Sequence, residues 1–220
     1  SLGGMNVDVD QWGIDVIYSG TQKCLSCPPG LSPISFSPAA VASVEKRTTK
    51  VSSWYLDISM IANYWGDNRA YHHTAPINMT YALHEALRLL LEEGLEASFA
   101  RHELNHQALK IGLETLGFTY AADPEHQLPM LNAVNIPGEV NDARMRLALL
   151  EQYNIEIGGG LGELKGQVWR IGLMGHSANP NSVLGLLTAL ENLFVESTIN
   201  CEAGVAYNAA NAIYLGEGSD

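Results

Sequence analysis

Positively charged residues are scarce in this chain of 220 residues. Lysine and arginine number 12 against 24 aspartates and glutamates, so the formal net charge at pH 7 is −12. Proteins that bind nucleic acids neutralise phosphate groups with clustered lysine and arginine side chains. The composition therefore argues against a nucleic-acid partner, and it makes each basic residue a candidate for a specific role.

Cysteine is scarce as well, with three residues in the chain. Such a small, odd number does not form a disulfide framework, so we expect reduced thiols. Cys24 and Cys27 form a C-x-x-C pair, the spacing of a redox motif or of half a metal site. No second pair exists and two prolines follow Cys27 directly, so we favour neither function and expect no metal.

Long apolar runs are missing too, and no stretch approaches the roughly 20 residues that a membrane helix requires. The sequence also shows no basic, apolar leader and no Ser-Lys-Leu ending. We therefore expect a cytoplasmic protein with no membrane partner. Apolar residues nevertheless make up 46% of the chain, which is enough for a sizeable core.

The segment around Lys23 is the most informative part of the sequence. Residues 13–17 (GIDVI) are rich in β-branched side chains and predict a buried strand, and residues 27–30 (CPPG) predict a turn. A lysine at the end of such a strand lies where open α/β sheets gather their functional groups. Apolar surroundings would leave its amine nucleophilic. By local pattern alone, an ordinary surface lysine is the better interpretation.

Hydroxyl groups gather in residues 71–76 (YHHTAP), directly before a predicted helix. Hydroxyl groups bind phosphate oxygens well, and a loop at a helix start can present several of them together. The alternative is structural: Tyr71 packs and Thr74 caps the helix. Without further information the structural alternative would be preferred.

Arg170 lies in the otherwise apolar residues 168–171 (VWRI), which follow a glycine-rich run at residues 158–162. The run does not continue into Lys-Ser or Lys-Thr, so it is no phosphate loop, but glycine lets the backbone approach a small ligand. Burying an unpaired guanidinium is costly, so we predict a planar anionic partner for Arg170. That partner is either a structural carboxylate or the carboxylate of a substrate.

Residues 102–106 (HELNH) match the H-E-x-x-H pattern, in which two histidines one helical turn apart bind zinc beside a glutamate base. The same helical face carries Phe99, Leu109 and Leu113. We therefore prefer the interpretation that His102 and His106 border a packed apolar stripe.

Three of these segments resemble one enzyme family. Residues 19–30, 71–83 and 158–172 are similar to the corresponding segments of alanine–glyoxylate and serine–pyruvate aminotransferases, class V enzymes that depend on pyridoxal 5′-phosphate. The resemblance runs from residue 1 to about residue 194. It implies that Lys23 is the catalytic residue and binds the cofactor covalently. It further implies the other site residues: Gln22, Tyr71 and Thr74 for the cofactor, and Arg170 for the substrate carboxylate.

The resemblance also implies an architecture. The fold is α/β: residues 1–96 form the C-terminal part of an aspartate-aminotransferase-like large domain with its linking helix, and residues 97–220 form a small α/β domain with a tail. An upstream half, carrying the aspartate that faces the pyridine nitrogen, is expected to be absent from this chain. Tyr71 and Thr74 are expected to serve the neighbouring subunit of a homodimer.

The expected activity is transamination between a small amino acid, alanine or serine, and a small 2-oxo acid, glyoxylate or pyruvate. One alternative is another class V enzyme such as a cysteine desulfurase, which typically has histidine where this chain has Gln22. The other is a non-catalytic fragment or interaction module.

Periodicity and turn residues predict the individual elements. Strands are expected at residues 5–9, 14–18, 33–36, 118–120, 131–136, 155–157 and 168–171. Helices are expected at residues 38–44, from 79 with a break at Gly94, at 96–116, 142–152 and 182–194, and as a short helix ending near residue 214.

Overall fold

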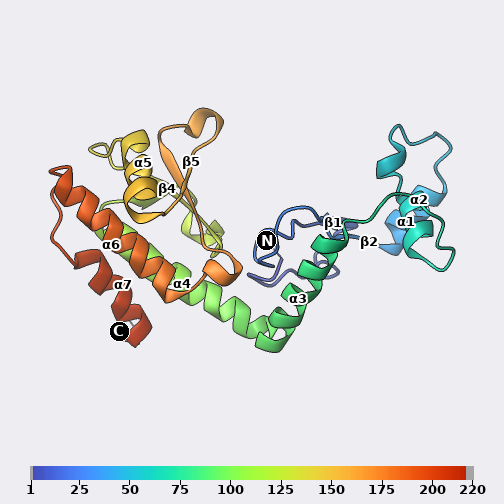
Figure 1. The fold of residues 1–220 in the computed structure, drawn as a ribbon, viewed down its shortest axis with the longest axis horizontal. Coiled ribbons are helices and arrows are strands. Elements are labelled where there is room, and N and C mark those ends of the chain that lie inside the picture. Colours follow the sequence, from blue (N-terminus) through green and yellow to red (C-terminus); the bar gives the residue numbers. More distant parts are fainter. Residues whose placement is uncertain (1, 217–220) are drawn as a thin grey trace.

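The structure, a computed structural model, describes residues 2–216. The chain is drawn out along one axis, with α1 and α2 at one end and the helices α4–α7 at the other (Figure 1). Helix α3 (Ile77–Glu93) joins these parts and meets α4 (Leu95–Thr115) at Gly94. Gly94 has φ +89°, a left-handed value that favours glycine, so the predicted helix break lies at this residue.

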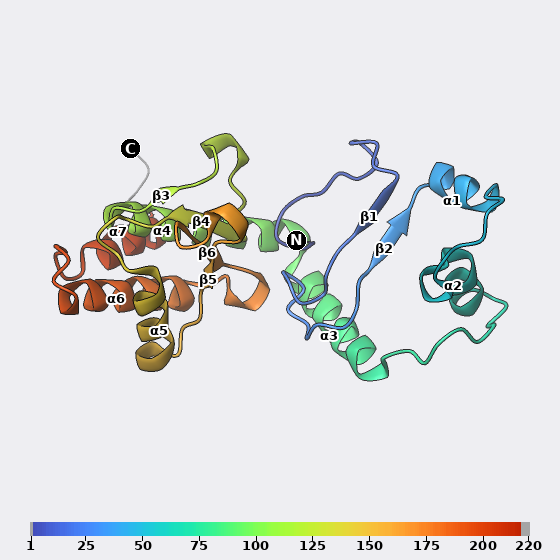
Figure 2. The ribbon, with the colours of Figure 1, turned by 90° about the horizontal axis from the view of Figure 1, so that it is seen from above.

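A four-stranded antiparallel sheet organises the second half of the chain. Its strand order is β3 (Thr119–Tyr120), β4 (Leu131–Asn135), β6 (Val168–Gly172), β5 (Gly158–Gly159). Alternate side chains of a strand face opposite sides, so Trp169 and Ile171 of β6 enter the core while Arg170 faces away from it. Helices α4, α6 (Pro180–Glu196) and α7 (Val205–Leu215) pack together beside the sheet, and α5 (Asp142–Tyr153) packs on α6 (Figure 2).

The last helix confirms the short helix that was expected to end near residue 214. Helix α7 ends at Leu215 and packs on α4 and α6, with Ala206 and Ala210 completely buried. The buried carboxylate of Glu191 accepts backbone N–H groups of Gly204, Ala206 and Tyr207 at the start of α7. These bonds satisfy amides that a helix leaves free at its first turn.

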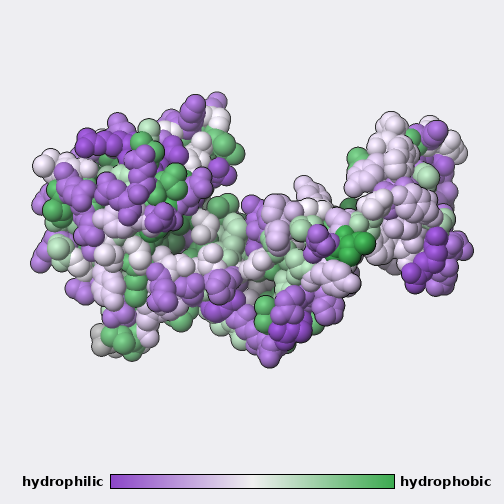
Figure 3. All heavy atoms as spheres, in the orientation of Figure 1, coloured by the Kyte–Doolittle hydropathy of each residue, from purple (hydrophilic) through white to green (hydrophobic). Residues whose placement is uncertain are grey.

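The first half of the chain contains little regular structure. Strands β1 (Val16–Tyr18) and β2 (Ile34–Phe36) pair antiparallel, and α1 (Pro38–Glu45), the turn η1 (Trp54–Leu56) and α2 (Ile58–Trp65) follow. The Ser37 side chain accepts the Ala40 N–H and Pro38 occupies the first turn, which confirms the predicted start of α1. Apolar atoms lie on the surface around β2 (Figure 3).

Two predicted strands are wrong. Residues 5–9 contain no strand, because residues 6–8 are irregular and a turn begins at residue 9. The Asn6 amide donates to the Asp8 carboxylate, and the Trp12 N–H donates to the Asp8 carbonyl. Residues 155–157 are not a strand either. The neighbouring Gly158 and Gly159 pair with β6, while Ile155 and Ile157 pack against the core. The domain boundary expected at residue 96 stays a prediction. Among residues 2–216, no helix is both long and apolar enough to cross a bilayer.

Candidate active site

Lys23 lies at the tip of a tight turn that follows β1. The Cys27 N–H donates to the Thr21 carbonyl (N···O 3.1 Å), and the Ser26 N–H donates to the Lys23 carbonyl (2.9 Å). The side chains of Cys24 and Leu25 are buried beneath the turn, whereas Lys23 is exposed. The apolar enclosure expected around the amine is not found among the described residues, where Lys23 is exposed.

A cavity of about 370 Å³ joins the Lys23 turn to the segment after β6. The turn supplies Gln22, Lys23, Ser26 and Cys27 to its wall. The opposite wall consists of Gly172, Met174, His176 and Ser177. Two segments that are far apart in the sequence therefore face one small space.

Arg170 precedes this wall on the same strand. By strand alternation its side chain lies on the same face of the sheet as Gly172, which lines the cavity. Its Nε donates to the Gly159 carbonyl (2.8 Å), and a Cβ atom at Gly158 would lie 3.3 Å from its Nη2. Arg170 forms no ion pair with a carboxylate of residues 2–216. The alternative of a structural carboxylate partner has no support within this part of the chain.

The Gln22 side chain folds back over the backbone of Gly20. A Cβ atom at residue 20 would lie only 2.5 Å from Gln22 Oε1. Glycine at position 20 therefore makes room for the Gln22 side chain. Gln22 and Lys23 both line the cavity.

Tyr71 and Thr74 lie on the loop between α2 and α3. Their hydroxyl groups bind one another (O···O 2.9 Å), and both residues are exposed, Tyr71 by 74%. The structural alternative is wrong for Thr74, because the N-cap of α3 is Pro76 and no side chain caps this helix. Tyr71 packs edge-on against the Tyr64 ring but stays exposed. Neither Tyr71 nor Thr74 lines the Lys23 cavity. Within one chain the structure brings Lys23 and Gln22 together with the end of β6, and it does not bring Tyr71 and Thr74 to them.

The two remaining motifs are part of the packed interior. His102 and His106 are buried and hydrogen-bonded to protein atoms, which confirms that they belong to the packed side of α4. No cluster of three metal-binding side chains occurs in residues 2–216. Cys24 and Cys27 form no disulfide within residues 2–216, and burial raises the pKa of Cys27.

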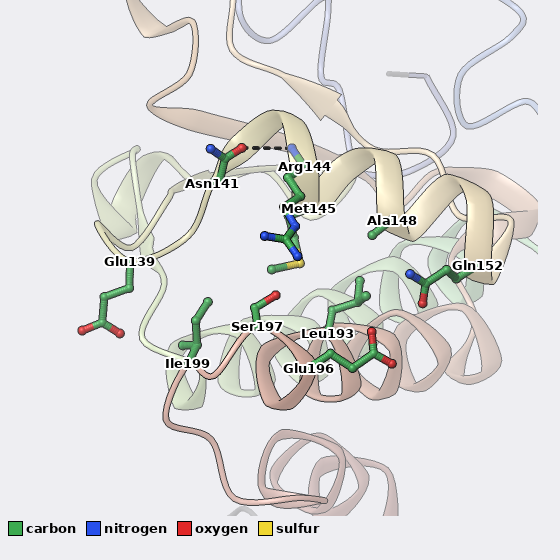
Figure 4. A pocket seen from close by; sticks show the side chains of 10 residues that line it. All are labelled: Glu139, Asn141, Arg144, Met145, Ala148, Gln152, Leu193, Glu196, Ser197 and Ile199. Atoms are coloured by element: carbon green, nitrogen blue, oxygen red, sulfur yellow. Dashed lines mark hydrogen bonds between the residues drawn. The ribbon is translucent and has the colours of Figure 1, made fainter.

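Sequence reasoning missed Ser26, Met174, His176 and Ser177, which also line the cavity. Their only signal in the sequence is position, since Met174 and His176 follow directly after the strand that carries Arg170. A separate cavity of about 270 Å³ lies between α5 and the end of α6, with Arg144, Met145 and Leu193 among its lining side chains (Figure 4). It shares no residue with the Lys23 cavity.

The family profile of class-V aminotransferases matches residues 1–166. The chain belongs to this family. It is 37% identical to the (S)-ureidoglycine–glyoxylate transaminase of Bacillus subtilis over 99% of the chain and 57% of the relative. It is 43% identical to the alanine–glyoxylate aminotransferase of Oryctolagus cuniculus over 86% of the chain and 50% of the relative. The chain thus spans about half the length of these curated relatives.

Solved structures agree on the fold. The ureidoglycine–glyoxylate aminotransferase of Bacillus subtilis superposes with a TM-score of 0.94 and 40% identity, covering 98% of this chain and 56% of that one. The alanine–glyoxylate aminotransferase of Nostoc sp. gives 0.86 and 47%, covering 88% and 52%. This fold is the expected aspartate-aminotransferase-like one. The alanine–glyoxylate relatives match 86% and 88% of the chain, which agrees with the expected end of that resemblance near residue 194, whereas the ureidoglycine–glyoxylate relatives match 98% and 99% of the chain.

Pyridoxal 5′-phosphate is the cofactor of this family, as the resemblance implied. The described residues fit it. The Lys23 amine is exposed at a small cavity and forms no ion pair with residues 2–216, so it is available for a covalent bond. Tyr71 and Thr74 present two exposed hydroxyl groups suited to phosphate oxygens.

Proposed function

We propose that this chain provides the lysine and the carboxylate-binding arginine of an aminotransferase that uses glyoxylate as amino acceptor. The observation that carries the proposal is the shared cavity between the Lys23 turn and the end of β6, the strand of Arg170. Relatives named for glyoxylate support the acceptor. Gln22 argues against a cysteine desulfurase, because those enzymes typically have histidine before the lysine.

Each residue has a distinct role in this proposal. When bound, the cofactor supplies an electron sink for the charge that develops at the substrate Cα. Lys23 holds the cofactor covalently, and its freed Nζ then takes the proton from the substrate Cα. Arg170 binds the substrate carboxylate through two parallel N–H groups and so aligns the Cα–H bond with the lysine. Gln22 binds the cofactor beside Lys23.

Tyr71 and Thr74 are proposed to bind the cofactor phosphate of a neighbouring subunit in a homodimer. The segment that carries them follows α2, which lies at the end of the molecule away from α4–α7 (Figure 1). In residues 54–71, the aromatic side chains of Trp54, Trp65 and Tyr71 are more than half exposed. Mixing Lys23→Ala with Tyr71→Phe subunits should restore activity that each variant lacks. Unaltered activity of Tyr71→Phe under conditions where the protein is monomeric would argue against a shared site.

Three amino donors are candidates. Alanine or serine is supported by the alanine–glyoxylate relatives, and (S)-ureidoglycine is supported by the relative that matches 99% of the chain, including residues after 194. Rates with glyoxylate and each of the three donors would choose between them. The expected upstream half belongs to the proposal as well, so the chain alone should bind the cofactor weakly and transaminate negligibly. A cytoplasmic location is also part of the proposal.

Borohydride reduction of the cofactor-loaded protein, followed by peptide mapping, tests the proposal directly. Lys23 should carry the label, and Lys23→Ala should abolish both label and transamination. Lys165 provides the comparison, because it lies between the glycine-rich run and β6 but does not line the Lys23 cavity. Label on Lys165, Lys110, Lys46 or Lys50 in place of Lys23 would refute the assignment.

A further inference from the structure

His102 takes no part in the proposed chemistry, yet it contacts the loop beside the Lys23 turn. It lies on α4 and is completely buried. Its Nδ1 is 2.7 Å from the Ser98 carbonyl oxygen, and its Nε2 accepts the Gly175 N–H at 2.9 Å. A carbonyl can only accept, so Nδ1 carries the ring proton and Nε2 has the free lone pair. Burial lowers the pKa of His102 and favours this neutral form.

Gly175 is held on both of its polar backbone groups by neighbouring residues of α4. While His102 accepts its N–H, the Arg101 guanidinium donates to its carbonyl (2.7 Å) and to that of Ala178 (2.9 Å). Arg101 also binds the Glu93 carboxylate across the helix break. The side chains of Arg101 and His102 therefore hold the loop after β6, residues 173–178, on α4.

The opposite side of this loop touches the Lys23 turn. The His176 N–H donates to Ser26 Oγ at 2.8 Å. A Cβ atom at Gly175 would lie 2.6 Å from the Cys24 carbonyl oxygen and would collide with Ser26 Oγ. Gly175 has φ +56°, so both its conformation and the close approach favour glycine. The loop is thus clamped between α4 and the turn that carries Lys23.

We propose that His102 is a positioning residue: by holding the Gly175 N–H it keeps residues 173–178 against the Lys23 turn and so sets the separation of Lys23 and Arg170. Arg170 lies five positions before Gly175 on the same continuous segment. Because β6 holds the arginine in the sheet, a shift of the loop moves the Lys23 turn relative to Arg170 through the contact of His176 with Ser26. The functional consequence rests on the proposed function, in which both residues contact one substrate and small misplacements are costly.

Two substitutions separate the two ring nitrogens. In His102→Asn the amide can reach the Ser98 carbonyl but is too short to accept from Gly175. In His102→Gln the side-chain oxygen can take the place of Nε2. His106→Gln is the matched control, since His106 is buried one turn further along α4 and its Nδ1 binds Asn132 Oδ1 instead (2.7 Å).

Hydrogen exchange of the full chain without cofactor measures the positioning itself. His102→Asn should speed exchange of the peptide containing Gly175 and His176 about tenfold, since a lost buried hydrogen bond has an effect of this order. Exchange at residues 21–27 should rise with it, and His102→Gln should be close to wild type. If His102→Asn does not fold, Ser26→Ala provides the test. This substitution is on the surface and removes the acceptor of the His176 N–H, so it should speed exchange at His176. Unchanged exchange in these variants, or an equal effect of His106→Gln, would overturn the proposal.

Kinetics of the complete enzyme then connect positioning to activity. With cofactor, His102→Asn should keep the borohydride label on Lys23 and raise KM for the amino donor about tenfold. His102→Gln should have the wild-type KM. Absence of label on Lys23 in the wild-type protein would refute the proposed function and leave the exchange result standing. Normal labelling of Lys23, together with unchanged hydrogen exchange of residues 173–178 in His102→Asn, would refute the positioning role alone.

Discussion

Residues 2–93 and residues 95–216 bury their apolar side chains to very different degrees. The hydrophobic core is formed entirely within residues 108–210, where Trp169, Leu109 and Phe194 are almost inaccessible to solvent. In the first region the buried hydrophobic side chains among described residues are Cys24, Leu25 and Cys27, all in the Lys23 turn. The second region is thus stabilised by its own core, while the first leaves its aromatic side chains on the surface.

This difference locates the candidate site. The cavity lies where the small buried cluster of the first region meets the end of β6. One wall therefore belongs to a segment with few internal contacts, and the other belongs to a strand held in a packed sheet. Arg170 has a stable support within the chain, whereas Lys23 depends on contacts such as the one between Ser26 and His176.

The largest expected difference between the regions is in core substitutions. Trp169→Ala removes a completely buried side chain and should lower the free energy of unfolding by about 3–5 kcal/mol. Trp65→Ala removes a side chain that is 61% exposed and should change it by less than about 0.5 kcal/mol in the isolated chain. Urea unfolding of both variants checks the comparison, and equal losses would contradict it.

A pair of glycines sharpens the comparison within the second region. A Cβ atom at Gly112 on α4 would meet two methyl groups of Leu187 on α6, one of them at 2.8 Å. Gly112→Ala should therefore cost about 1–3 kcal/mol through overpacking. Gly185 on α6 has open space, so Gly185→Ala should stabilise the protein by about 0.5–1 kcal/mol. Thermal unfolding should move the two variants in opposite directions, and a stabilised Gly112→Ala would show that α4 and α6 pack loosely.

A smaller, pH-dependent effect is expected at Asp142. The Arg146 guanidinium and the Trp169 indole N–H bind its carboxylate (2.6 and 2.8 Å) and hold its pKa below the usual value. Because the folded-state pKa is lowered, the stabilisation is present above the unfolded-state pKa of about 3.9 and is lost as the pH falls through the folded value. Asp142→Asn should cost about 1 kcal/mol at pH 7. Urea midpoints of the two proteins should converge below about pH 3, and a constant difference down to that pH would contradict this origin.

Local signals in the sequence predicted much of the fold. Ser37 and Pro38 placed the start of α1, and Gly94 placed the break between α3 and α4, because caps and glycines act on the residues next to them. Residues 5–9 were mispredicted as a strand, because the Asn6 side chain binds the Asp8 carboxylate, a local bond that competes with strand pairing.

The site was predictable only in part. Lys23, Gln22, Tyr71, Thr74 and Arg170 each lie in a segment with a recognisable pattern, and their roles stay predictions. The contact of Ser26 with His176 has no such pattern, because it joins residues 150 positions apart and depends on how the helix α4 holds the loop. Contacts of this kind require the tertiary structure.

The central claim is that Lys23 and Arg170 act on one substrate, and Arg170→Lys in the complete enzyme tests it most directly. A lysine ammonium cannot reproduce the two parallel N–H donors, and truncating one partner of a desolvated charged pair costs about 2–5 kcal/mol. The value of kcat/KM for the amino donor should therefore fall by about one and a half to four decades, while borohydride still labels Lys23. Loss of cofactor labelling with normal kinetics in the remaining loaded protein would contradict the claim and make Arg170 a structural residue.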